Sequence, residues 1–198
     1  DNVQFGNLES MVLNTKAGDD TININRIPIG FVRILSGAGD DLVNVNNFTE
    51  TNSILMDLGD GNDQMNLVAG EASGAITVYG NAGDDTFVSS KAAYTNALFD
   101  GQEGSDTYDI SILDRSQRFV VARDTGVVGN DELKIRGTLL NDSLIVRSGI
   151  VITPNQDIIS NQNTESMTIM SEGSDDVISI YGVSSPETNA MTQTGDDL

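Results

Sequence analysis

A glycine-aspartate turn recurs about every 21 or 22 residues, and this repeat constrains the fold of the 198-residue chain more than any other feature. The second aspartate of successive copies falls at positions 20, 41, 63, 85 and 106, in steps of 21, 22, 22 and 21 residues. A fixed period of this length is typical of solenoid proteins, in which each repeat buries its apolar face only against its neighbours. The chain is therefore expected to form a stack of similar coils.

The residues after each aspartate alternate between apolar and polar, which indicates a strand with one buried face. Ile22 and Ile24 fall on the buried face of the first such strand, and Asn23 falls on its outer face. A second apolar run follows half a coil later, at 31–35, 54–58, 75–79 and 97–99. Equivalent strands of successive coils must stack in parallel, and such connections are almost always right-handed. The sequence therefore predicts an all-β fold, a right-handed parallel β-helix or β-roll solenoid with about 21–22 residues per coil.

The regularity of the repeat divides the chain into three parts. Residues 1–112 are expected to form regular coils, residues 113–165 irregular coils or inserted loops, and residues 166–198 resumed coils of the same solenoid. Degenerate copies of the turn occur at 129–133 and 141–144, and better copies return at 173–178 and 195–198. Because the chain stops inside a repeat, it is expected to be a segment of a larger protein.

The composition narrows the classes of partner. With 30 acidic against 10 basic side chains the net charge is -20, which disfavours binding to nucleic acid or anionic lipid and favours cations. We expect no nucleic-acid partner and, without a long apolar run, no membrane insertion. The chain has no cysteine and no histidine, so thiolate sites and the usual general base are absent.

The chemistry of the turn favours calcium. Calcium prefers six to eight oxygen ligands, and a glycine-aspartate turn offers both carboxylates and accessible backbone carbonyls. Carboxylates stacked about 4.8 Å apart would repel by roughly 3.5 kcal/mol at an effective dielectric constant near 20, and divalent ions between the coils would relieve this repulsion. The competing interpretation is that Gly-Asp is simply a favourable turn dipeptide whose aspartate caps its own backbone.

The copies at 37–43 and 59–65 resemble the nonapeptide Gly-Gly-x-Gly-x-Asp-x-U-x of the repeats-in-toxin (hemolysin-type) family, where U is a large apolar residue. The resemblance implies a β-roll in which the aspartates and turn carbonyls bind Ca2+ between coils. Here one motif occurs per coil instead of two, so a single ion column is expected, with the opposite edge closed by loops such as 50–53 and 90–93. The ligands implied are Gly18, Asp20, Gly39, Asp41, Gly61, Asp63, Gly83, Asp85, Gly104 and Asp106, and the returning motif adds Asp175 and Asp176. The preceding acids Asp19, Asp40 and Asp84 either support these ligands or are simply solvated.

These features favour a calcium-binding structural segment of a secreted or cell-surface protein, acting as a spacer, matrix or adhesin scaffold and not as an enzyme. Its expected partners are calcium ions and either neighbouring solenoid copies or a surface polysaccharide. One alternative is a polysaccharide lyase, because Arg115, Arg118 and Arg123 lie near acidic turns. Another is a flat carbohydrate- or ice-binding face formed by the asparagine and threonine side chains of Thr21, Asn23, Asn25, Asn44 and Asn46.

Overall fold

The computed structural model describes residues 9–25, 30–47, 53–113, 117–154, 156–182 and 187–192, with only the backbone described at 69–73, 91–95 and 187–192. Over these residues the chain is all-β and has no helix, and so none that could span a membrane. The first eight strands are β1 (Ser10–Asn14), β2 (Thr21–Ile24), β3 (Phe31–Ala38), β4 (Leu42–Val45), β5 (Ser53–Asp60), β6 (Gln64–Ala82), β7 (Thr86–Glu103) and β8 (Thr107–Ser111). They are followed by β9 (Phe119–Arg123), β10 (Glu132–Arg136), β11 (Ser143–Arg147), β12 (Ile150–Ile152), β13 (Ile158–Gln162), β14 (Ser166–Ser171), β15 (Val177–Tyr181) and β16 (Glu187–Thr192).

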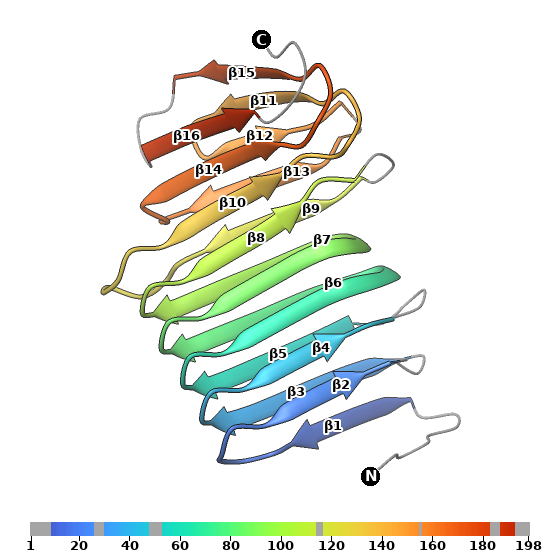
Figure 1. Ribbon diagram of the computed structural model, residues 1–198. Helices are drawn as coiled ribbons and strands as arrows, with labels where there is room; N and C mark the ends of the chain where they lie inside the picture. Colours follow the sequence, from blue (N-terminus) through green and yellow to red (C-terminus); the bar gives the residue numbers. More distant parts are fainter. Residues whose placement is uncertain are drawn as a thin grey trace.

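The strands stack into two layers that face each other, as Figure 1 shows. Sheet I contains β2, β4, the first part of β6 and of β7, β8, β10, β14 and β16; sheet II contains β1, β3, β5, the second part of β6 and of β7, β9, β13, β12, β11 and β15. Neighbouring coils pair in parallel with the sequence period, so that Ile22 lies beside Val43 and Val43 beside Met65. The predicted parallel solenoid with coils of about 22 residues is confirmed, whereas its right-handed sense stays a prediction.

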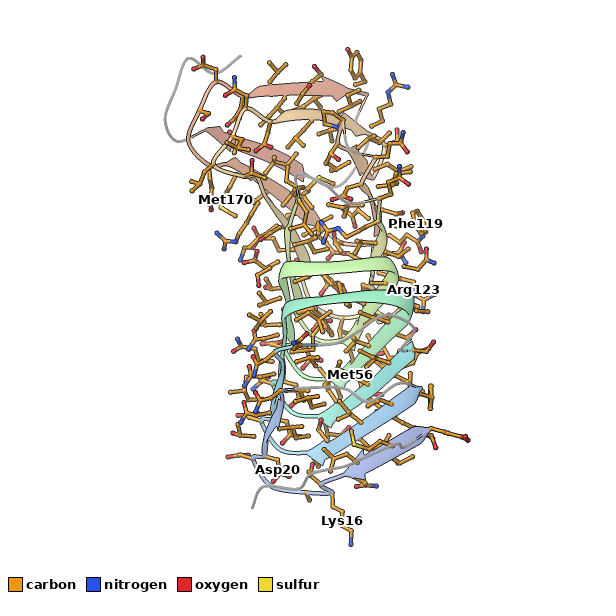
Figure 2. The ribbon with its side chains drawn as sticks, turned by 90° about the vertical axis from the view of Figure 1, so that its right-hand side faces the viewer. Lys16, Asp20, Met56, Phe119, Arg123 and Met170 are labelled. Atoms are coloured by element: carbon orange, nitrogen blue, oxygen red, sulfur yellow. The ribbon has the colours of Figure 1, made fainter. Side chains whose placement is uncertain are left out.

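The core lies between the two sheets and follows the period-two pattern. Met56 lies between them, whereas Phe119 and Arg123 lie on the outside of sheet II and Met170 on the outside of sheet I (Figure 2). Three aromatic rings stack within the core, with centroids 6.1 Å apart for Phe87 and Phe99 and 5.1 Å apart for Phe87 and Tyr108. Each coil thus contributes a thin layer of apolar side chains, which explains how a chain so poor in aromatic residues forms a continuous core.

One predicted loop is a strand instead. Residues 90–93 were expected to close the edge opposite the aspartate turns, but they lie inside β7, which runs from sheet I into sheet II without a break. Lys91 to Tyr94 pair in parallel with Ala69 to Ala72 of β6, so the backbone hydrogen bonds continue around this edge. Of the other predicted loop, residues 50–52 lie outside the described residues.

Beyond β9 the chain departs from simple coiling. β11 pairs antiparallel with β12, and β12 pairs antiparallel with β13, which then returns beside β9. Sheet I meanwhile continues in parallel from β8 through β10 and β14 to β16. The irregular stretch is therefore a local zigzag of three strands within sheet II, and the two-layer stack continues past it (Figure 1).

Candidate functional site: the aspartate edge

The repeated aspartates lie on one edge of the solenoid, where the chain passes from sheet II to sheet I. We call this the first edge, and its inner aspartates are Asp20, Asp41, Asp63, Asp85, Asp106 and Asp131. The five from Asp41 onward are almost fully buried, with relative exposures of 1–2%. They are therefore part of the interior of the turn, whereas the sequence motif had suggested an open column of carboxylates.

Each inner aspartate from Asp41 onward accepts a hydrogen bond from the preceding coil. The main-chain N–H groups of Asp20, Asp41, Asp63, Asp85 and Asp106 donate to Oδ1 of Asp41, Asp63, Asp85, Asp106 and Asp131 at 2.7–2.8 Å. Glu165 continues the series, because its Oε2 accepts from the N–H of Asp131 at 2.7 Å. This inner ladder satisfies turn amides that have no partner within their own coil.

The residues just before the inner aspartates form a second ladder that runs the other way. The N–H of Asp40 donates to Oδ1 of Asp19, that of Asn62 to Asp40, that of Asp84 to Asn62, and that of Ser105 to Asp84, at 2.8–3.0 Å. These outer side chains are mostly exposed, but each holds the coil that follows it. Adjacent coils are therefore joined by two side chains, one from each coil. These contacts explain why both motif positions recur with the period of the coil.

The glycines of the motif allow neighbouring turns to touch. A Cβ atom added to Gly61 would lie 2.2 Å from the carbonyl oxygen of Gly39, and one on Gly83 would lie 2.0 Å from that of Gly61. The predicted carbonyl ligands thus point toward the glycine of the next coil. Only glycine fits there, both because of this close approach and because φ is +138° at Gly61 and +129° at Gly83.

The second carboxylate oxygen of the inner aspartates is the unusual feature of this edge. The Oδ2 atoms of Asp20, Asp41, Asp63, Asp85 and Asp106 are buried and accept no hydrogen bond from the described residues. At Asp85 and Asp106 this oxygen faces the backbone of Gly80 and Gly101, where a Cβ would approach within 2.1 Å and 1.8 Å. A buried carboxylate with an unsatisfied oxygen is costly unless a proton or a cation compensates its charge.

Burial accordingly raises the pKa of four of these carboxyls, those of Asp41, Asp63, Asp85 and Asp106. Loss of solvation is the main cause, and it outweighs the amide hydrogen bond that favours the charged form. The pKa rises to about 6 at Asp63 and Asp106 and to about 8 at Asp85, near the middle of the regular coils. Neighbouring aspartates add to the shift, so the column as a whole favours added positive charge.

The potential metal ligands at this edge suit a hard cation only in part. The free atoms are carboxylate oxygens, which suit Ca2+. Within the described part of the chain, however, no three acidic side chains come together closely enough to hold one metal ion. Any ion bound here would therefore need backbone carbonyl oxygens or water to complete its coordination.

The aspartate at the sixth coil was left out of the predicted ligands because its spacing is irregular. Asp131 follows Asp106 by 25 residues, yet it continues the inner ladder, and burial raises its pKa to about 7. Asp124 adds a further buried acid beside it, and burial also raises the pKa of this group. The sequence triplet Gly129-Asn130-Asp131 could have identified this copy of the motif, because it carries the same residue types as the regular copies.

The returning motif lies on the opposite edge. Asp142 and Asp176 precede β11 and β15, where the chain passes from sheet I to sheet II, and the N–H of Asp142 donates to Oδ1 of Asp176 at 2.7 Å. Asp175 and Asp176, predicted as calcium ligands, are therefore not in line with Asp20 to Asp106. The copy at 195–198 lies outside the described residues.

The arginines near the acidic turns are engaged in ion pairs. Arg118 is buried and pairs with Asp157, with Nη2 and Oδ2 2.9 Å apart, and both side chains have no exposed surface. Arg123 pairs with Asp100 on the outside of sheet II, through both its Nε and Nη2 atoms. Arg115 lies outside the described residues. Both described arginines are therefore paired with carboxylates of the fold, and Arg118 is buried.

The chain was compared with protein-family models, with curated proteins and with solved structures, and none of the three comparisons found a match. The geometry is that of a parallel β-solenoid consistent with a β-roll, and the chain is placed in no family.

Proposed function

We propose that this chain is a structural β-solenoid segment of a large extracellular or cell-surface protein, and that calcium ions stabilise its aspartate edge. The observation that carries the proposal is the column of buried, unsatisfied Oδ2 atoms along the first edge. The two layers, the continuous core and the two ladders suit a rigid spacer, matrix or adhesin scaffold.

The calcium part rests on electrostatics. Five successive coils each bury one carboxylate oxygen in the same column, in a chain whose net charge is -20. A divalent ion bound only by the folded state stabilises that state by mass action and lowers the repulsion between neighbouring turns. The millimolar calcium concentration outside cells would keep such sites filled, which is why an extracellular location fits them.

A calcium titration tests the proposal. Thermal unfolding followed by circular dichroism is measured in excess chelator and in a series of Ca2+ concentrations at pH 8. We expect the melting temperature to rise with Ca2+ and to level off, and a magnesium series serves as the control for general screening. A melting temperature that is the same in chelator and in millimolar Ca2+ would contradict the calcium role and leave only the scaffold.

The other candidate functions gain less support. The lyase interpretation relied on free arginines, and the two that are described are paired with Asp157 and Asp100. The asparagine row on sheet I does form a ladder, in which Nδ2 of Asn44 and of Asn66 donate to Oδ1 of Asn23 and of Asn44. These amides bond to one another, and the row ends at Val88, so it stabilises the sheet and offers a short polar surface.

A further inference from the structure

The outer surface of sheet II carries more large apolar side chains than that of sheet I. Its outward residues include Val12, Phe31, Leu35, Leu55, Tyr79, Leu98, Phe119 and Val121. Val12 is 65% exposed, and Phe31 and Phe119 are 42% and 43% exposed. Equivalent positions of sheet I carry mainly asparagine, threonine and glutamine. Exposed apolar side chains that gather on one face of a molecule are typical of an interface.

This surface also lacks the net charge of the molecule. Between β1 and β9, the outward charges in the central part of sheet II are Arg33, Asp57, Asp100 and Arg123, which sum to zero. Two further acids, Asp60 and Glu103, are exposed at the ends of β5 and β7, next to the first edge. Asp57 accepts a hydrogen bond from Asn81, and Asp100 pairs with Arg123. Much of the acidity lies instead on the first edge. The central part of sheet II therefore has no net charge, which lowers the repulsion between two copies of this acidic chain.

Two pairs of the apolar residues are arranged symmetrically about β6. The described strand order is β1-β3-β5-β6-β7-β9-β13, so β6 is the central strand of this stretch. Leu55 and Leu98 lie beside Thr77, one strand away on either side. Two strands away, Phe31 and Phe119 occupy matching positions, in line with Ser53 and Asn96. A twofold axis along β6 brings Phe31 opposite Phe119 and Leu55 opposite Leu98. The same axis places Leu35 opposite Arg123 and Asp57 opposite Asp100, which is itself paired with Arg123.

We propose that sheet II is a self-association surface, on which a second copy of the chain docks face to face with its coil axis reversed. Such a contact is isologous: Phe31 faces the partner's Phe119, Leu55 faces the partner's Leu98, and Thr77 lies on the axis. Two sheets packed in this way lie about 10 Å apart, with their outward side chains interdigitated. The proposal is independent of calcium binding, because none of these residues belongs to the aspartate edge.

The available area suits a weak dimer. Seven strands spaced by about 4.8 Å, each contributing roughly five residues, offer roughly 500 Å2 per copy, or about 1,000 Å2 in total. This is at the lower end of the range for specific interfaces. The dimer is therefore expected to dissociate on dilution.

Crosslinking tests the predicted axis, and the chain helps because it contains no native cysteine. Thr77→Cys places one thiol on the axis, and Asn44→Cys places a control thiol on the outside of sheet I. With a bis-maleimide that spans about 10 Å and alkylates one thiol at each end, Thr77→Cys should give a covalent dimer in high yield and Asn44→Cys only a trace. Equal yields from the two variants, or no dimer from Thr77→Cys, would overturn the proposal.

Sedimentation equilibrium tests the same surface without crosslinking. Leu98→Glu introduces a charge near the axis, and Val88→Glu introduces the same charge on sheet I. Circular dichroism checks that both variants remain folded. We expect Leu98→Glu to weaken the dimer at least tenfold and Val88→Glu to leave it unchanged, in Ca2+ and in chelator alike. A wild-type chain that stays monomeric at millimolar concentration, or two variants with equal effects, would refute the docking surface.

Discussion

The main-chain N–H of Asp63 donates a 2.8 Å hydrogen bond to Oδ1 of Asp85, which lies one coil further along the solenoid. Both residues are buried, and Oδ2 of Asp85 accepts no hydrogen bond from the described residues. One carboxylate thus has two functions: its first oxygen joins adjacent coils, and its second leaves a buried negative charge without a partner. The first four predictions separate these two functions.

Replacing Asp85 should distinguish the hydrogen bond from the charge. Asp85→Ala leaves the buried N–H of Asp63 without an acceptor, and we expect a loss of about 1–3 kcal/mol in the free energy of unfolding. Asp85→Asn keeps an oxygen acceptor and removes the charge, so in chelator it should cost much less than Asp85→Ala. Urea denaturation of both variants measures the difference, and equal losses would mean that the hydrogen bond is not the main contribution.

Asp84→Asn is the matched control for the calcium response. Asp84 is the exposed neighbour of Asp85 and keeps an acceptor for the N–H of Ser105 when it becomes asparagine. If the buried column binds the ions, Asp85→Asn should reduce the rise in melting temperature on adding Ca2+, and Asp84→Asn should change it little. The opposite ranking would place the ions on the outer ladder.

The raised pKa values predict that the chain in chelator is more stable in mild acid. Burial raises the pKa from 3.8 to about 6 at Asp63 and about 8 at Asp85, so the folded state binds protons more tightly than the unfolded state. Their contribution is fully present below pH 3.8 and is lost as the pH rises through 6 and then 8. The melting temperature in chelator should therefore fall between pH 5 and pH 8. A profile that rises over this interval would show that these carboxyls are not protonated in the fold.

Calcium and protons should act as alternatives at this edge. Because protonation already removes the charge at low pH, added Ca2+ should raise the melting temperature more at pH 8 than at pH 5. The measurement is the same thermal scan at the two pH values, with and without Ca2+. A calcium effect of equal size at both would mean that the ions bind elsewhere.

The tight turn gives a prediction about backbone strain. Gly37, Gly59, Asn81 and Gln102 occupy equivalent positions, and φ is positive at all four. Asn81→Gly removes a side chain from a strained backbone position and should therefore stabilise the chain by up to about 1 kcal/mol. The lost side-chain hydrogen bond from Asn81 to Asp57 offsets part of this gain. Gly59→Ala should destabilise it strongly, because the new Cβ would lie 1.6 Å from the carbonyl oxygen of Gly37. Chemical denaturation of the two variants checks both signs.

The buried ion pair in the irregular coils gives the last prediction. Asp157→Ala leaves the guanidinium of Arg118 buried without its carboxylate, and such changes cost about 3–5 kcal/mol. The double variant Arg118→Met with Asp157→Leu removes both charges and should recover much of this loss. Thermal unfolding of the single and double variants tests the prediction, and a double variant less stable than Asp157→Ala would show that the pair itself stabilises the coil.

Much of the architecture follows from local pattern alone. The alternation around Ile22, Val43 and Met65 determines which side chains face the core, and the 21- or 22-residue period determines which residues meet in neighbouring coils. Both are properties of consecutive residues, and a parallel stack is the one arrangement that buries every copy in the same way. The position of Asp20 to Asp106 on one edge follows for the same reason.

The tertiary structure decided what the aspartates do. Whether Oδ1 of Asp85 faces solvent, an ion or the N–H of Asp63 depends on a coil 22 residues away, and the residue types allow all three. Asp142 and Asp176 follow strands of sheet I and precede strands of sheet II, so they lie on the other edge, although their motif reads like the earlier copies. Likewise Leu55 and Leu98 became a symmetric pair only through the strand order of sheet II. Local sequence determines which face of a strand is buried, and long-range packing determines which groups meet there.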